Sequence, residues 1–197
     1  MPVLHFATFL KLLALSTGDK MRAIAKYGDS DGGYDYWKPL RSGCIQYCAH
    51  EASRQRVRSH ITSNSGRTNE ARCIEKFELT ADWMDRQTGQ GFAPNRGVWR
   101  SPSGAFSVHI EPEIGFETNN RNNITAVYPT SSATLNRETA GAGILLLSQN
   151  YRDRTNEVFG IYEVDTNRCY RTPTNNSEGV LLADIATIDA AFGRLNL

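Results

Sequence analysis

The stretch that decides the fold is Phe106-Ser-Val-His-Ile-Glu-Pro-Glu-Ile-Gly-Phe-Glu117, followed by Thr-Asn-Asn-Arg-Asn-Asn and then by Ile124-Thr-Ala-Val-Tyr128. Apolar and polar residues alternate over 106–110 and, after Pro112, again over 114–116, which is the period of a half-buried strand. Four asparagines between 119 and 123 tolerate left-handed backbone conformations, so the chain can reverse before Ile124. The pattern therefore predicts a long β-hairpin over 106–128.

Three glutamates, Glu111, Glu113 and Glu117, lie on this predicted hairpin. Carboxylates that lie close together suit Mg²⁺, because the ion prefers hard oxygen ligands and keeps several of its waters. Glu111 and Glu113 are therefore candidate catalytic and metal-binding residues. The alternative is a solvent-facing strand edge at which Pro112 discourages further pairing.

Helical spacing dominates the first third of the chain. We expect helices near 4–15, from about 17 to 28 with Ser16 or Thr17 as the cap, and from about 70 to 89. A longer helix is expected from about 35 to 60, because one stripe of it is apolar: Trp37, Leu40, Cys44, Cys48 and Ala52.

The remainder alternates between strands and helices. Asn136 can cap a helix, the segments 158–164 and 168–171 flank a turn that begins at Asp165, and Ser177 can cap a final helix. We therefore predict an α+β fold, with a mostly antiparallel sheet built on two β-hairpins, backed by helices, and a helical N-terminal third. Residues 1–90 would pack on the sheet core of 91–197 within one cooperative domain.

The composition is that of an ordinary globular domain. The chain has 197 residues, and 22 Lys plus Arg against 21 Asp plus Glu indicate neither a nucleic-acid protein nor an acidic one. The apolar opening over 2–15 has no basic leader and is interrupted by Lys11, so we interpret it as a core helix rather than a signal segment. No segment has the length of a membrane span, and four cysteines without secretory context favour the cytoplasm.

Positive charge is concentrated between 41 and 72, where six arginines stand against two acids. Arg54 and Arg58 lie one helical turn apart, and a guanidinium suits a phosphate. Lys38 and Arg41 lie near a helix start, where the helix dipole favours an anion. Together with Arg67 they are the candidate nucleic-acid-binding residues. The alternative is a solvated helix face, with Arg41 paired to an acid.

Three motifs together resemble an uncharacterised family of bacterial proteins. They are Tyr34-Asp-Tyr-Trp-Lys-Pro-Leu-Arg41, then Ile110-Glu-Pro-Glu-Ile-Gly-Phe116 with Ala126-Val-Tyr128 after it, and Phe159-Gly-Ile-Tyr-Glu-Val-Asp165. Members of that family usually carry a lysine where this chain has Ala126. The resemblance implies no activity, because the family has none that could be transferred.

The order of the expected elements also resembles the core of the restriction-endonuclease-like nucleases, which is a helix, a three-stranded meander, a helix and a further strand. This resemblance implies a divalent metal, held by an acid on one strand and by an acid on the next strand, two residues ahead of a lysine. Glu111, Glu113 and Glu117 could supply acids, whereas 124–128 offers neither an acid nor a lysine. By this comparison the metal site is incomplete.

One pair of acids and one pair of cysteines each have both a functional and a structural interpretation. Glu163 and Asp165 form an acid pair near the second hairpin, and Glu163 is the third candidate catalytic residue, although Asp165 also suits a turn. Cys44 and Cys48 are spaced as two zinc ligands would be, but no second pair follows, so we expect buried thiols. No nucleophile motif, phosphate loop or dinucleotide fingerprint occurs.

These patterns favour an intracellular nuclease-like domain without a complete metal site, which acts by binding nucleic acid or a partner protein. Two alternatives stay open. One is an active metal-dependent nuclease that uses Glu111, Glu113 or Glu163 with Mg²⁺ and a lysine from elsewhere. The other is a homo-oligomeric structural or regulatory subunit, which is favoured if the long hairpin or the N-terminal helices expose apolar surface.

Overall fold

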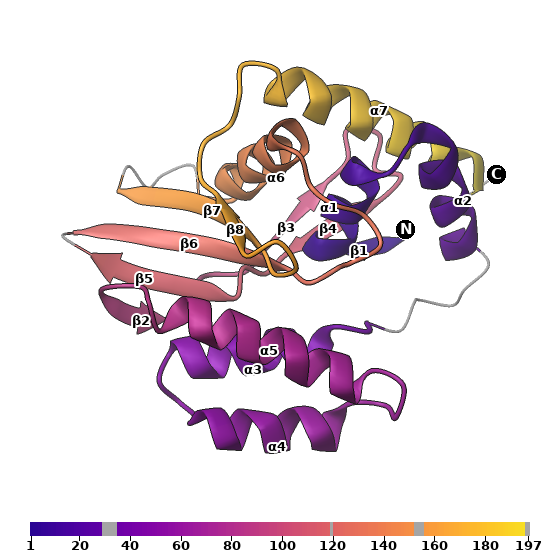
Figure 1. Cartoon of the computed structure of the whole chain (residues 1–197). Coiled ribbons are helices and arrows are strands. Elements are labelled where there is room, and N and C mark those ends of the chain that lie inside the picture. Colours follow the sequence, from indigo (N-terminus) through magenta and orange to yellow (C-terminus); the bar gives the residue numbers. More distant parts are fainter. Residues whose placement is uncertain (29–34, 119, 152–155, 196–197) are drawn as a thin grey trace.

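Two β-sheets and the helices around them make up the part of the chain that the structure describes, which is residues 1–28, 35–118, 120–151 and 156–195 (Figure 1). The structure is a computed structural model. The predicted α+β class is confirmed.

The smaller sheet has the strand order β1-β4-β3, and the larger sheet has the order β2-β5-β6-β7-β8. The strands are β1 (Val3–His5), β2 (Gln90–Phe92), β3 (Gly97–Arg100), β4 (Ser107–Ile110), β5 (Ile114–Thr118), β6 (Arg121–Tyr128), β7 (Glu157–Glu163) and β8 (Arg168–Tyr170). Strand β1 pairs in parallel with β4, and β6 pairs in parallel with β7. The other neighbours are antiparallel, so both sheets are mixed.

The helices of the described residues are α1 (Phe6–Ala14), α2 (Thr17–Gly28), α3 (Lys38–Cys48), α4 (Arg54–Asn64), α5 (Glu70–Met84), α6 (Arg137–Gln149) and α7 (Ser177–Leu195). None of these described helices combines the length and the apolar character needed to cross a bilayer.

Strand β6 shows how the larger sheet is packed. Ile124, Ala126 and Tyr128 belong to one buried cluster and Val127 belongs to another, because successive side chains of a strand point to opposite faces of the sheet. The first cluster includes residues of α1, α6 and α7, and the second includes residues of α3, α4 and α5. Helices therefore cover both faces of the larger sheet, as Figure 1 shows.

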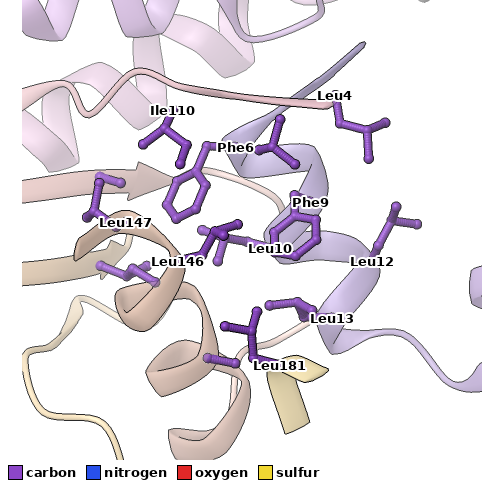
Figure 2. Packing of buried hydrophobic residues seen from close by; sticks show 14 of the residues in the cluster. Leu4, Phe6, Phe9, Leu10, Leu12, Leu13, Ile110, Leu146, Leu147 and Leu181 are labelled. Carbon is purple, nitrogen blue, oxygen red and sulfur yellow. The ribbon is translucent and has the colours of Figure 1, made fainter. Parts of the chain in front are cut away.

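The first cluster joins the N-terminal helix to the sheet core. Figure 2 shows Leu10 of α1 pointing toward Leu146 of α6. Gly143 permits this close approach, because an added Cβ there would lie 2.2 Å from Leu10 Cδ2. Both clusters draw residues from 1–90 and from 91–197, so the two regions share their cores.

The predicted hairpin over 106–128 is divided between the two sheets. Strands β5 and β6 form the expected antiparallel pair, which begins with Ile114 opposite Thr125. Residues 107–110 instead form β4, which pairs with β1 and β3. The prediction of one continuous hairpin was wrong, because Pro112 has no N–H to offer a ladder and because alternation does not identify the partner strand.

Asparagines in the left-handed region close both hairpin turns of the larger sheet. Asn120 has a φ of 61° between β5 and β6, and Asn167 has a φ of 50° between β7 and β8. Asn119, which we also expected in the first turn, lies outside the described residues. The predicted second hairpin is confirmed, as is the cap of α6, where the Asn136 side chain accepts hydrogen bonds from two backbone N–H groups.

Three helices differ from their predicted extents, and α5 ends at Met84 rather than near residue 89. Residues 3–5 form β1 rather than the first turn of a helix, because they pair with β4. The long helix expected over 35–60 is two helices, α3 and α4, and the chain turns after Cys48. Ser53 starts α4, since its Oγ accepts a hydrogen bond from the Arg56 backbone N–H at 3.3 Å.

Candidate functional site

Arg41 lies at the centre of a buried cluster of ionisable side chains. It stands near the start of α3, two residues after Pro39, whose missing N–H is harmless in the first helical turn. Only 8% of the Arg41 side chain is exposed. Because a buried guanidinium is stable only when it is paired, the groups around Arg41 determine what this cluster can do.

Three carboxylates and one imidazole surround the Arg41 guanidinium. Its Nη2 donates to Asp35 Oδ2 and to His5 Nδ1, which is 3.2 Å away. Its Nη1 lies 3.3 Å from Glu111 Oε2 and 4.0 Å from Glu113 Oε1. The cluster thus joins the end of β1, the start of α3 and the segment between β4 and β5.

Glu113 is the most deeply buried carboxylate of the cluster, with 3% of the residue exposed. Its Oε2 accepts a hydrogen bond from the Val127 backbone N–H at 2.7 Å. Burial raises the pKa of Glu113 to about 7, although Arg41 and the Val127 N–H act in the opposite direction. Near neutral pH this carboxyl group therefore exchanges between its charged and its neutral form.

His5 closes the cluster on the side of the smaller sheet. Burial, and after it the charge of Arg41, lowers the pKa of His5. The imidazole is therefore neutral at neutral pH, and its Nδ1 accepts the hydrogen bond from Arg41. The other ring nitrogen lies 3.4 Å from Asp35 Oδ2, and the ring meets His109 edge-on, with 6.1 Å between the centroids.

Arg41 lies beside both carboxylates that we considered as Mg²⁺ ligands, Glu111 and Glu113. Mg²⁺ binds oxygen ligands at roughly 2.0–2.1 Å and keeps several waters, whereas the Arg41 guanidinium occupies the space beside both carboxylates. If the β5–β6 register is continued by one residue, Ala126 comes opposite Glu113. The Ala126 methyl group cannot act as a metal ligand. Among the residues described, no three or more His, Cys, Asp or Glu side chains are arranged to hold a metal.

Glu163 lies away from the Arg41 cluster, at the end of β7. Its Oε1 accepts a hydrogen bond from the Leu135 backbone N–H at 2.8 Å. Its Oε2 accepts hydrogen bonds from Thr166 Oγ1 at 2.6 Å and from the Tyr170 hydroxyl at 3.3 Å. Glu163 thus stabilises the segment before α6 and the turn after β7 through these hydrogen bonds. It does not lie with Glu111 and Glu113.

Arg54 and Arg58 lie beside α5 and pair with acidic side chains there. Arg54 Nη2 lies 2.7 Å from Asp82 and 2.6 Å from Asp85, and its Nη1 lies 3.3 Å from Glu78. Arg58 Nε pairs with Glu78 at 2.5 Å. These pairs connect α4 to α5, so a phosphate would have to compete with carboxylates for both arginines.

The other candidate side chains are scattered. Lys38 and Arg67 are exposed, and Lys38 lies beside a small cavity with Asp35 and His60. Glu117 is exposed on β5. Cys44 and Cys48 are buried in the second cluster, where burial raises the pKa of both thiols. Of the five predicted phosphate-binding residues, Arg41 is the one that lies with the predicted acids.

The motifs singled out in the sequence meet around this cluster. Arg41 comes from the first motif, Glu111 and Glu113 come from the second, and Val127 from the short run over 126–128 that follows it. The third motif lies on β7, next to β6, where Ala126 pairs with Ile161. Tyr34, the first residue of the first motif, lies outside the described residues.

No protein-family model matches this chain, and no curated protein matches it significantly. The two family resemblances therefore rest on the motifs and on the order of the elements alone.

A cavity of about 410 Å³ adjoins the Arg41 cluster, and sequence reasoning did not single it out. His5 and Asp35 line it and also contact Arg41. Lys11 of α1 and Arg72 of α5 line it as well. No spacing rule joins two cations so far apart in the chain, so only the packing of α1 against the rest of the fold could reveal this site.

Proposed function

We propose that this chain is a nuclease-like domain of the bacterial cytoplasm that binds nucleic acid without cleaving it. The observation that carries the proposal is the position of Arg41, which lies against Glu111 and Glu113. The Arg41 guanidinium thus lies beside the carboxylates that would otherwise attract a divalent metal, and offsets part of their negative charge. The domain then keeps the architecture of a nuclease-like core with an arginine of its own beside the central carboxylates.

The topology of the larger sheet supports the nuclease-like part of the proposal. Helix α5 precedes the antiparallel strands β2, β5 and β6, with β3 and β4 of the smaller sheet inserted between β2 and β5, and α6 then connects β6 to the parallel strand β7. This is the order of helix, meander, helix and strand expected for that core. Because a fold hosts many functions, the order supports the architecture and the site chemistry must support the function.

The chemistry of β6 supports the absence of cleavage. A working site needs a charged group on β6, close to the acid that precedes β5, to assist the attacking water or the transition state. Ala126, which comes opposite Glu113, has no such group, and the Tyr128 hydroxyl donates to the Ala133 carbonyl at 2.7 Å. Both side chains are buried in the first cluster.

The cytoplasmic part rests on the thiols. All four cysteines are free, and Cys44, Cys48 and Cys73 are buried in the second cluster. Reduced cysteines suit a reducing compartment.

The test combines binding with cleavage. Fluorescence anisotropy with labelled single- and double-stranded oligonucleotides should show binding that weakens as salt rises, because phosphate contacts release counterions. The same oligonucleotides, incubated with Mg²⁺ or Mn²⁺, should stay intact. Absence of binding to every oligonucleotide would contradict the proposal.

An active metal-dependent nuclease is the second candidate, and one observation favours it. Arg41 converges with Glu111 and Glu113, and an arginine beside carboxylates can also stabilise a developing negative charge. Metal-dependent cleavage that disappears in both the Glu111→Gln and the Glu113→Gln variant would establish this candidate.

A further inference from the structure

The cavity beside the Arg41 cluster lies between elements that are distant in sequence. Strand β1 and helices α1 and α2 contribute residues to its wall, as do residues 35–37, the start of α5 and the loop after β6. Its volume of about 410 Å³ is within the usual range for a small-molecule site. Among the described residues that line it, the single acid is Asp35, and its carboxylate is already paired with Arg41.

The charge of this cavity favours an anion. Lys11 and Arg72 both line it, and within the described residues neither forms an ion pair with a carboxylate. Thr130, Ser131 and Ser132 add hydroxyl groups from the loop after β6. Cations and hydroxyl donors around one cavity are the groups that bind phosphate oxygens.

Aromatic rings supply a second kind of contact. Tyr36 and Trp37 line the same cavity, with their ring centroids 4.7 Å apart in an edge-to-face arrangement. The Tyr36 hydroxyl donates to the Thr68 carbonyl at 3.4 Å, which orients the ring. An aromatic wall beside cations suits a nucleobase attached to a phosphate, because every base can pack its flat face on a ring.

A second cavity continues the first. It has a volume of about 460 Å³ and shares Lys11, Ala23, Tyr27 and Ser132 with the first cavity. Lys26 of α2 lines this continuation, as do Asp19 and Arg22, which pair with each other. The sugar–phosphate backbone of a strand longer than one nucleotide can therefore meet further cations outside the first cavity. A free mononucleotide would not need them.

We infer that these joined cavities bind one unstacked nucleotide of a single-stranded nucleic acid, with its base against Tyr36 and Trp37 and its phosphates at Lys11 and Arg72. The inference rests on the proposed function and adds the strand type and the residues that hold it. A duplex offers no free base to the aromatic wall, so single strands bind more tightly than duplexes of the same sequence.

The first experiment compares ligands. Anisotropy is measured with a labelled oligothymidylate, with the same strand annealed to its complement, and with unlabelled thymidine 5′-phosphate, thymidine and inorganic phosphate as competitors. The single strand should bind at least about tenfold more tightly than the duplex. Thymidine 5′-phosphate should compete better than thymidine or phosphate alone. Competition by phosphate as strong as by the nucleotide would overturn the role of the aromatic wall.

The second experiment compares variants. The Lys11→Gln/Arg72→Gln double variant should lose about tenfold or more in single-strand affinity, with a smaller salt dependence. The Arg96→Gln/Arg100→Gln double variant removes two exposed cations outside the joined cavities and should bind like the wild type. Thermal unfolding of both proteins checks that they fold. The Tyr36→Ala variant should lose single-strand affinity while duplex affinity stays unchanged.

The outcomes separate this inference from the proposed function. If oligonucleotides bind but the Lys11/Arg72 variant binds as the wild type does, the joined cavities are not the site and the proposed function stands. If single strands and duplexes bind equally, the unstacked nucleotide is excluded. If no oligonucleotide binds at all, both the inference and the proposed function fail.

Discussion

The Glu113 carboxylate accepts a hydrogen bond from the Val127 backbone N–H, with 2.7 Å between Oε2 and the nitrogen. This bond lies one step beyond the β5–β6 ladder, which begins at Ile114 opposite Thr125. The Glu113 side chain thus contacts β6, although the Glu113 backbone is not part of the β5–β6 ladder. The same carboxyl group faces Arg41 with its other oxygen, so it connects the larger sheet to the start of α3.

The ionisation of Glu113 should make stability depend on pH. Its pKa is raised from 4.5 to about 7, so the folded protein binds this proton more tightly than the unfolded chain does. The resulting stabilisation is complete below pH 4.5 and is lost as the pH rises to about 7. Wild type should lose on the order of 1–3 kcal/mol relative to Glu113→Gln across this window. Urea unfolding of both proteins at several pH values measures the difference in stability. The prediction is contradicted if the wild type instead gains stability relative to Glu113→Gln as the pH rises.

Removal of Arg41 should destabilise the fold strongly. An Arg41→Met variant leaves Asp35, Glu111 and Glu113 without their cation, and breaking a buried ion pair costs roughly 3–5 kcal/mol. Arg58→Ala is the matched control, because its pair with Glu78 is on the surface and should contribute at most about 1 kcal/mol. Chemical denaturation compares the two. Equal losses would show that the Arg41 cluster is not a structural centre.

The buried face of α3 should be sensitive to truncation. Leu40 is fully buried in the second cluster, so Leu40→Ala should cost roughly 2–5 kcal/mol as a cavity opens. Leu79 is 41% exposed on α5, and Leu79→Ala should change stability by about 0.5 kcal/mol or less. Both values come from urea unfolding. A Leu40→Ala protein as stable as the wild type would mean that α3 is not packed as described.

The contact between α1 and α6 should not tolerate a side chain at residue 143. A Cβ there would lie 2.2 Å from Leu10 and 2.7 Å from Ile161, so Gly143→Ala should cost about 1–3 kcal/mol despite the better helix propensity of alanine. Gly179 has nothing within 4 Å of an added Cβ, and Gly179→Ala should be neutral or stabilising. If overpacking is the cause, Leu10→Ala should cost less in the Gly143→Ala background than in the wild type. Thermal unfolding of the wild type, of Gly143→Ala, of Leu10→Ala and of the variant with both changes measures this coupling.

The arginines of α4 should matter more for helix packing than for nucleic acid. Because Arg54 and Arg58 are paired with acids of α5, the Arg54→Ala/Arg58→Ala variant should unfold more easily, by roughly 1 kcal/mol. Its affinity for oligonucleotides should change by less than about twofold, since no phosphate contact is lost. Anisotropy over a salt series measures this. Loss of binding would restore the sequence-based prediction that these two arginines hold the phosphates.

The amino-acid sequence alone determined the class of the fold and the positions of several turns and helix starts. The turn residues that begin at Asp165 predicted the second hairpin, and Asn136 predicted the start of α6. These features depend on neighbours within a few residues, because backbone preference and capping are local effects. Leu40 and Cys44 could be assigned to a buried helix face for the same reason.

Only the tertiary structure decided which strands pair and which charges meet. Alternation shows that residues 106–110 have a buried face, but the same pattern fits pairing with β5 or with β1, and β1 lies about a hundred residues earlier in the chain. Arg41 could be recognised as a cation near a helix start, yet its partners Glu111 and Glu113 come from a distant segment. Long-range packing of α3 against the larger sheet brings them together, and local spacing contains no information about such contacts.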